Sequence, residues 1–77
     1  MRRSDIIRIV ENGQSNNDYI AIFVRGNKKP IWEIETCENV IFNETTFDIY
    51  NPDSDKRIIV SYMMVRSLAS SPYSFFD

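Results

Sequence analysis

The chain has 77 residues, which is enough for one domain and too few for two. Its 9 Lys and Arg residues against 11 Asp and Glu residues give a net charge of −2, so the chain as a whole is not a polycation suited to non-specific nucleic-acid binding. Histidine is absent and Cys37 is the only cysteine, which excludes an internal disulfide, Ser-His-Asp and Cys-His catalytic arrangements, and multi-thiolate metal sites. We expect no catalytic site, no cofactor and no metal.

The short length also bears on assembly and location. A domain of this size buries only about 60% of the surface that its unfolded chain exposes, and self-association is the remaining way to supplement so small a core. We therefore expect a homo-oligomer. No apolar run reaches the roughly 18 to 20 residues of a membrane span. Arg8 and Glu11 interrupt the apolar stretch after Arg2-Arg3, and no cleavage site follows, so we expect a cytoplasmic protein that does not contact a membrane.

The first element, segment 4–11, carries signals for both helix and strand. It contains four apolar β-branched residues: Ile6, Ile7, Ile9 and Val10. Their spacing would suit two helical turns with Ser4 as the cap. Stiff β-branched side chains favour a strand, which is the prediction we adopt, with one short helical turn before it as the alternative. Asn12-Gly13 predicts the start of a polar loop that runs through Asn17.

The clearest predicted strand is segment 18–25, which alternates cleanly. Its odd and even side chains are both apolar, which is typical of a central strand. One side carries Ile20, Ile22 and Val24, and the other carries Tyr19, Ala21 and Phe23. Gly26-Asn27 ends the strand, and Lys28-Lys29-Pro30 completes a basic loop.

The rest of the chain is predicted as short strands with turn residues between them. They cover segments 31–36, 39–42, 46–50 and 56–62, and a further strand in 63–68 follows a bend. Such spacing predicts an all-β fold, a small five- or six-stranded antiparallel barrel of the SH3-like or Sm-like type. Segment 51–55 is predicted as a hairpin loop, and Ser70-Ser71-Pro72 ends regular structure. We expect one domain over 1–72 and an aromatic tail over 73–77.

Three groups of side chains are weighed as chemical sites. Glu33 and Glu35 share a strand face, so they could act as acid and base or bind magnesium, but we interpret them as the solvated side of the strand. Cys37 is interpreted as an ordinary buried or half-buried thiol. Basic residues beside aromatic ones are candidates for nucleic-acid contact, the alternative being rim aromatics that cover the barrel end. This candidate set is Arg25, Lys28, Lys29, Tyr50, Lys56, Arg57 and Tyr62.

The last strand and the tail are the candidates for contact with another subunit or a protein partner. Two adjacent phenylalanines after a Ser/Pro break cannot both face one core in an extended tail, so we expect the tail to dock on the chain itself, a neighbouring subunit or a partner. Docking onto the molecule's own assembly is the interpretation we prefer. The candidate contact residues are Val65, Arg66, Leu68, Tyr73, Phe75 and Phe76.

Segment 46–72 resembles the second half of an Sm-like small barrel. Phe47-Asp48-Ile49-Tyr50, the loop 51–55, the strand 57–62 and Val65-Arg66-Ser67-Leu68 follow the order of that family. The resemblance implies a ring-forming, RNA-binding protein whose short last strand pairs with the neighbouring subunit. Divergent phage-encoded members end in a similar rhythm of apolar residues and serines, which implies a phage origin in a host cytoplasm. The glycines and the Asp-x-x-Met-Asn of the family's first motif have no counterpart in 18–42.

These observations lead to three hypotheses. The first is a non-catalytic β-barrel that self-associates through strand edges and binds a protein partner. The second is an Sm-like oligomer that binds RNA or single-stranded DNA. The third is a small phage-type inhibitor that masks an enzyme by charge mimicry through four acids: Glu33, Glu35, Glu38 and Glu44.

Overall fold

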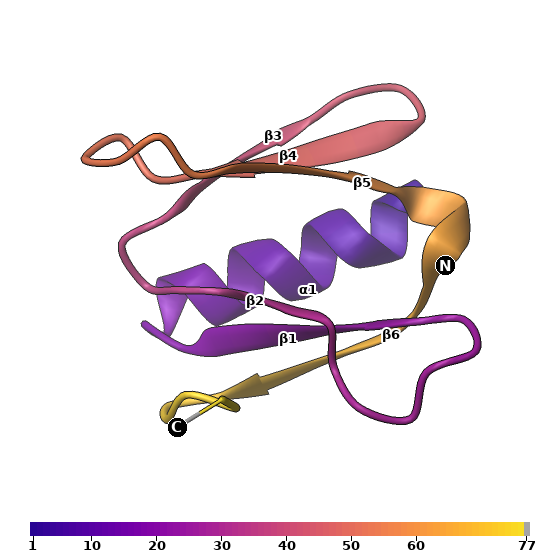
Figure 1. Ribbon diagram of the computed structural model, residues 1–77, viewed down its shortest axis with the longest axis horizontal. Coiled ribbons are helices and arrows are strands. Elements are labelled where there is room, and N and C mark those ends of the chain that lie inside the picture. The colour runs from indigo at the N-terminus through magenta and orange to yellow at the C-terminus, as the bar shows by residue number, and fades with distance from the viewer. Residues whose placement is uncertain (77) are drawn as a thin grey trace.

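A computed structural model describes residues 1–76 of the chain (Figure 1). It contains one α-helix, six strands and a single 3-10 turn, in an order that places the helix first. The elements are α1 Arg3–Ser15, β1 Tyr19–Val24, β2 Trp32–Ile34, β3 Asn39–Phe42, β4 Thr46–Tyr50, β5 Arg57–Ser61, η1 Tyr62–Met64 and β6 Val65–Ser71. None of the helices in residues 1–76 has the length and apolar composition needed to cross a membrane.

The first element is a helix, so the strand predicted for 4–11 is wrong. Ile6, Val10 and Gly13 are buried along one face of α1, at the spacing of successive helical turns. The intrinsic helix penalty of a β-branched residue is only a few tenths of a kcal/mol, whereas burying one such side chain contributes about 1.5 to 3 kcal/mol. Burial therefore outweighs local propensity. Ser4 is not the cap either, since Arg2 takes the N-cap position without a side-chain hydrogen bond.

Gly13 lies in the last turn of α1 instead of opening a loop. A Cβ atom at this position would lie 2.8 Å from Cδ1 of Ile20, well inside normal contact distance. The absence of a side chain thus lets the end of the helix approach β1 closely. The chain turns at Asn17, which has a φ of 56° and allows β1 to start two residues later.

The six strands form two antiparallel sheets of three strands each. Their orders are β2-β1-β6 and β3-β4-β5. The prediction of a mainly antiparallel β domain is confirmed, and segment 18–25 does supply the central strand of one sheet. Closure into a barrel is not observed, because each sheet ends in a strand that is paired on one side only.

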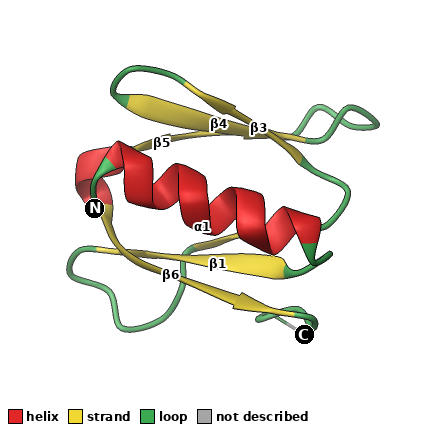
Figure 2. Cartoon of the chain, turned by 180° about the vertical axis from the view of Figure 1, so that it is seen from behind, coloured by secondary structure: helices red, strands yellow, loops and turns green. Residues whose placement is uncertain are grey.

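The two sheets face each other as layers, and α1 crosses the gap between them. Figure 1 shows β3, β4 and β5 above and β1, β2 and β6 below, and Figure 2 shows the helix in front when the molecule is viewed from behind. The core lies between the helix and the inner faces of both sheets. It is made of Ile6, Val10, Ile20, Ile22, Val24, Ile34, Phe47, Ile49, Val60, Tyr62 and Val65.

Candidate functional site

The edge strands of the two sheets carry the longest rows of backbone groups without a hydrogen-bond partner from a neighbouring strand. β5 pairs only with β4, and β6, which is seven residues long, pairs only with β1. The two edge strands are consecutive in the chain and are joined by the η1 turn. Unpaired N–H and C=O groups along an edge strand are a template for pairing with another strand. The β5 and β6 edges are therefore the first candidate interface.

Three exposed apolar side chains lie on β5 and on the η1 turn that joins the two edge strands. Ile59 on β5 is 61% exposed, and Met63 and Met64 in η1 are 79% and 53% exposed. The predicted contact residue Val65 is completely buried, because the chain turns at η1 and β6 begins with its first side chain in the core. Leu68 is half-buried against the core. Of the predicted residues in β6, only Arg66 presents its side chain to solvent.

Arg66 is directed outward by a β-bulge. β6 pairs Val65 with Val24 and Ser67 with Phe23, which leaves Arg66 without a partner on β1. Its guanidinium lies 5.4 Å from the ring centre of Phe23 and donates a hydrogen bond to the Asn27 carbonyl oxygen at 3.0 Å. This contact ties the start of β6 to the β1–β2 loop.

The basic residues without an acidic partner gather at one end of the molecule. The N-terminus, the β1–β2 loop, the β3–β4 loop and η1 all lie at the right in Figure 1. Arg25 donates to the Met63 carbonyl oxygen at 2.9 Å, and Arg3 donates to the Asn43 carbonyl oxygen at 2.9 Å. We define the basic end as the residues that share this region and form no ion pair within residues 1–76: Arg2, Arg3, Arg25, Lys28, Lys29 and Arg66.

Acidic residues predominate at the opposite end, although Glu44 lies in the β3–β4 loop beside the basic end. The α1–β1 connection, the β2–β3 connection and the β4–β5 loop lie at the left in Figure 1. Their acids are Asp18, Glu35, Glu38, Asp53 and Asp55. The chain is therefore electrically polarised despite its small net charge, and such separation creates a positive potential over one end.

Lys56 and Arg57 differ from the other predicted nucleic-acid contacts, because both are held by acids. Lys56 Nζ lies 2.8 Å from Glu38 Oε2 and 3.9 Å from Glu35 Oε2. Arg57 contacts Asp48 Oδ2 at 2.6 Å, and Asn43 donates to the other oxygen of that carboxylate at 3.0 Å. Their charges are largely compensated within the chain, so they contribute little to a phosphate site.

The two tyrosines proposed for base stacking have different surroundings. Tyr62 is 5% exposed, stacks on Phe47 with ring centres 5.6 Å apart, and donates its hydroxyl to the Asn43 carbonyl oxygen at 2.7 Å. A stacking role for Tyr62 is therefore wrong, because η1 turns the side chain into the core. Tyr50 is half-buried beside Arg57, whose guanidinium lies 6.0 Å from the ring centre.

The aromatic tail folds back onto the sheet, where the Glu33 carboxylate holds it. The Ser74 hydroxyl is 2.8 Å from Oε2 and 3.1 Å from Oε1, and the Phe75 backbone N–H donates to Oε1 at 2.6 Å. Glu33 is only 8% exposed, so its interpretation as a solvated strand residue is wrong. Nothing in the local alternation of the segment reveals a partner 41 residues away.

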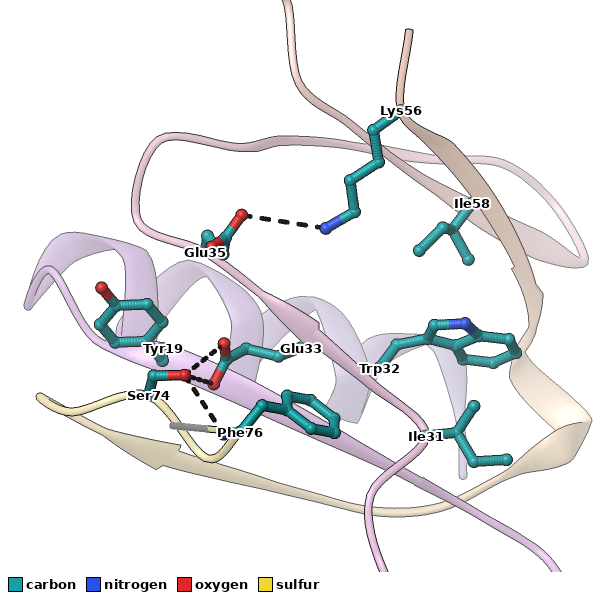
Figure 3. A pocket seen from close by; sticks show the side chains of 9 residues that line it. All are labelled: Tyr19, Ile31, Trp32, Glu33, Glu35, Lys56, Ile58, Ser74 and Phe76. Atoms are coloured by element: carbon teal, nitrogen blue, oxygen red, sulfur yellow. Dashed lines mark hydrogen bonds and ion pairs between the residues drawn. The ribbon is translucent and has the colours of Figure 1, made fainter. Parts of the chain in front are cut away.

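A hollow of about 430 Å³ lies beside this contact, on the side of the molecule away from α1 (Figure 3). Its wall is part apolar and part polar, with Glu35 and Lys56 at the rim and the tail along one side. The lining residues are Tyr19, Ile31, Trp32, Glu33, Glu35, Lys56, Ile58, Ser74 and Phe76. Tyr73 and Phe76 are 78% and 54% exposed, so docking of the tail leaves both rings largely in solvent.

Two other predicted sites have a different environment from the one expected. Cys37 is exposed in the turn between β2 and β3, so its prediction as a buried or half-buried thiol is wrong. The four acids of the mimicry hypothesis do not form one surface, because Glu33 and Glu38 are buried and Glu44 lies in a distant loop. Within residues 1–76, no group of three or more acidic or cysteine side chains is arranged to hold a metal ion.

No protein-family model, curated protein or solved structure matches the chain. Its function is therefore inferred from the residues and their geometry.

Proposed function

We propose that the protein is an assembly module that joins copies of itself by pairing β5 of one copy with β6 of the next. The observation that carries this proposal is the open seam between the two consecutive edge strands. Pairing of these strands within one chain would join the two sheets into one sheet of order β2-β1-β6-β5-β4-β3. Since they stay apart, each copy offers two complementary edges, and pairing across copies satisfies both.

The composition of the edges supports this assembly. Proteins that avoid edge-to-edge association protect their edge strands with lysines, prolines or inward-pointing charges. β5 reads Arg-Ile-Ile-Val-Ser and β6 reads Val-Arg-Ser-Leu-Ala-Ser-Ser, so each has a single charged residue and no proline. Because the contact joins two different surfaces, it is heterologous and produces a closed ring or a filament. The Sm-like resemblance of segment 46–72 favours the ring.

The experiment compares two substitutions on the same face of the same sheet. Ile59 on β5 and Ile41 on β3 both align with Asp48, are 61% and 43% exposed, and lie on opposite sides of β4. We expect Ile59→Lys to lower the particle mass measured by light scattering, since a charge on an edge strand opposes pairing. Ile41→Lys adds the same charge away from the seam and should keep the wild-type mass. Equal masses for the two variants would contradict the proposal.

A second function, binding of single-stranded nucleic acid, is favoured by the position of the basic end. β5 ends at η1 and β6 begins there. Antiparallel pairing of β5 with β6 of another copy therefore brings the η1 turns of the two copies next to each other. The basic ends of all copies would then lie on one side of the assembly and form a continuous positive surface for phosphates.

This second function is tested with charge-matched variants of two exposed residues. Lys29→Glu changes the basic end, whereas Arg8→Glu makes the same charge change on α1, where Arg8 is 3.6 Å from Asp5. We expect Lys29→Glu to weaken binding of a labelled single-stranded oligonucleotide and to flatten its salt dependence, and Arg8→Glu to change both much less. Absence of salt-dependent binding by the wild-type assembly would eliminate this function and leave self-association standing.

A further inference from the structure

The contact between Glu33 and the tail has the features of a recognition site. A carboxylate that is almost fully buried accepts hydrogen bonds from one side-chain hydroxyl and one backbone N–H of the segment Ser74-Phe75. Hydrogen bonds to an ionised acceptor are about twice as strong as those between neutral groups. The site therefore suits a hydroxyl side chain followed by a residue with a free backbone N–H, which proline cannot supply.

The surface around Glu33 receives a bent segment of chain, since the tail bends at Phe75 and the Ser74 hydroxyl accepts the Phe76 backbone N–H at 3.2 Å. Glu33 aligns with Ala21 on β1, and Ala21 aligns with Ala69 on β6, so small side chains follow the carboxylate across the sheet. Neighbouring residues of a strand point to opposite faces of its sheet. Since Ile20 points into the core, Ala21 and the residues aligned with it lie on the outer face of the sheet. Beyond the carboxylate, Phe76 of the tail lines the same hollow as Trp32 and Ile58.

We propose that this surface is a receptor for a bent Ser-Phe-Phe peptide, supplied by the tail of a second copy of the chain, with the chain's own tail as its resident competitor. The seated tail itself identifies the chemistry of the occupant. This inference is independent of edge pairing, because the tail begins after β6 ends at Ser71.

Because the chain's own tail occupies the site, the tail of a second copy must compete with it for binding. The tail and its receptor belong to one chain, so the effective concentration of the resident tail is high. An incoming tail binds only the fraction of molecules whose receptor is open, and its apparent affinity falls by that fraction. Any change that loosens the resident tail should therefore strengthen binding of the incoming one.

The experiment uses a synthetic peptide of residues 72–77 and three receptors. The intact chain, the intact chain with Ser74→Ala, and a chain truncated after Ser71 share every strand and differ in how firmly the site is filled. Binding is followed by the fluorescence of Trp32, the only tryptophan, which lines the hollow. We expect the affinity to rise in the order intact chain, Ser74→Ala, truncated chain.

Matched substitutions then test the role of the carboxylate. Glu33→Gln in the truncated chain should weaken peptide binding about tenfold, because it replaces an ionised acceptor by a neutral one. Glu44→Gln, in the exposed β3–β4 loop and outside the lining of the hollow, should leave binding unchanged. If a folded truncated chain does not bind the peptide, or binds it equally well with Gln at 33, the inference is overturned.

The Ser74→Ala variant keeps the test decisive if the truncated chain does not fold, since the intact tail remains present. Peptide affinity no higher for Ser74→Ala than for the intact chain would then refute the proposed competition. Particle mass is recorded in parallel. A change in peptide binding at constant mass separates tail recognition from strand-edge assembly.

Discussion

Lys56 offers the sharpest test of how charge is arranged in this fold, through the substitution Lys56→Met. Its Nζ atom lies 2.8 Å from Oε2 of Glu38, whose side chain is completely buried. The other oxygen, Oε1, accepts the backbone N–H of Glu35 at 2.8 Å. Methionine keeps the length of the lysine stem and removes its charge. The substitution therefore isolates the charge of Lys56 from the packing of its stem in the hollow.

The magnitude follows from burial. Removing one partner of a buried ion pair costs about 3 to 5 kcal/mol, because the other charge is left uncompensated. Lys56 itself is 35% exposed, so water enters the vacated position and reduces the cost to about 2 to 3 kcal/mol. A chain of 77 residues has a total stability of roughly 4 to 12 kcal/mol, so the loss is a large fraction of it.

The assay is urea unfolding at one fixed protein concentration, because self-association adds a concentration-dependent term to stability. The double variant Glu38→Gln with Lys56→Met should recover about 1 to 2 kcal/mol of the loss, since glutamine carries no charge and still accepts the Glu35 N–H. A loss below about 0.5 kcal/mol for Lys56→Met would refute the reasoning, because that is the size of an ordinary surface substitution.

Two further predictions concern the core. Ile6→Ala should lower the free energy of unfolding by about 2 to 4 kcal/mol and the thermal midpoint by about 10 °C or more, because the Ile6 side chain is fully buried. Glu11→Ala, at an exposed position of the same helix, should shift the midpoint by only a few degrees. Similar shifts for the two variants would mean that the buried face of α1 is misassigned. Tyr62→Phe should cost about 1 kcal/mol in urea unfolding, since it removes the hydroxyl that donates to Asn43 at 2.7 Å, whereas Tyr73→Phe on the exposed tail should cost nothing measurable.

The strands were predictable because their signal is local. Alternating apolar residues bounded by Gly, Asn and Pro mark β1 and β4, and both occupy the centre of their sheets. The helix was missed because Ile6 and Val10 are β-branched, and only their burial between the two sheets decides in favour of a helix. The loop predicted to start at Asn12-Gly13 was wrong for a similar reason, since Gly13 lets Ile20 approach the helix and does not form a turn.

The candidate sites depend on contacts between distant segments, which local pattern cannot supply. Alternation places Glu33 on the outer face correctly, but it does not show that Ser74 reaches back to its carboxylate. Composition identifies Lys56 as basic, but its acidic partner Glu38 comes from another connection. The grouping of unpaired basic residues with η1 likewise requires the fold. By contrast, the free edge of the last strand was implied by the short length and by the strand pattern.

Amide hydrogen exchange at a series of protein concentrations tests edge pairing most directly. If β5 and β6 pair between copies, exchange of their amides should slow as the concentration rises, while exchange in the central strand β1 stays constant. Exchange in β5 and β6 that does not depend on concentration, together with a monomeric mass throughout the series, would contradict assembly through these edges.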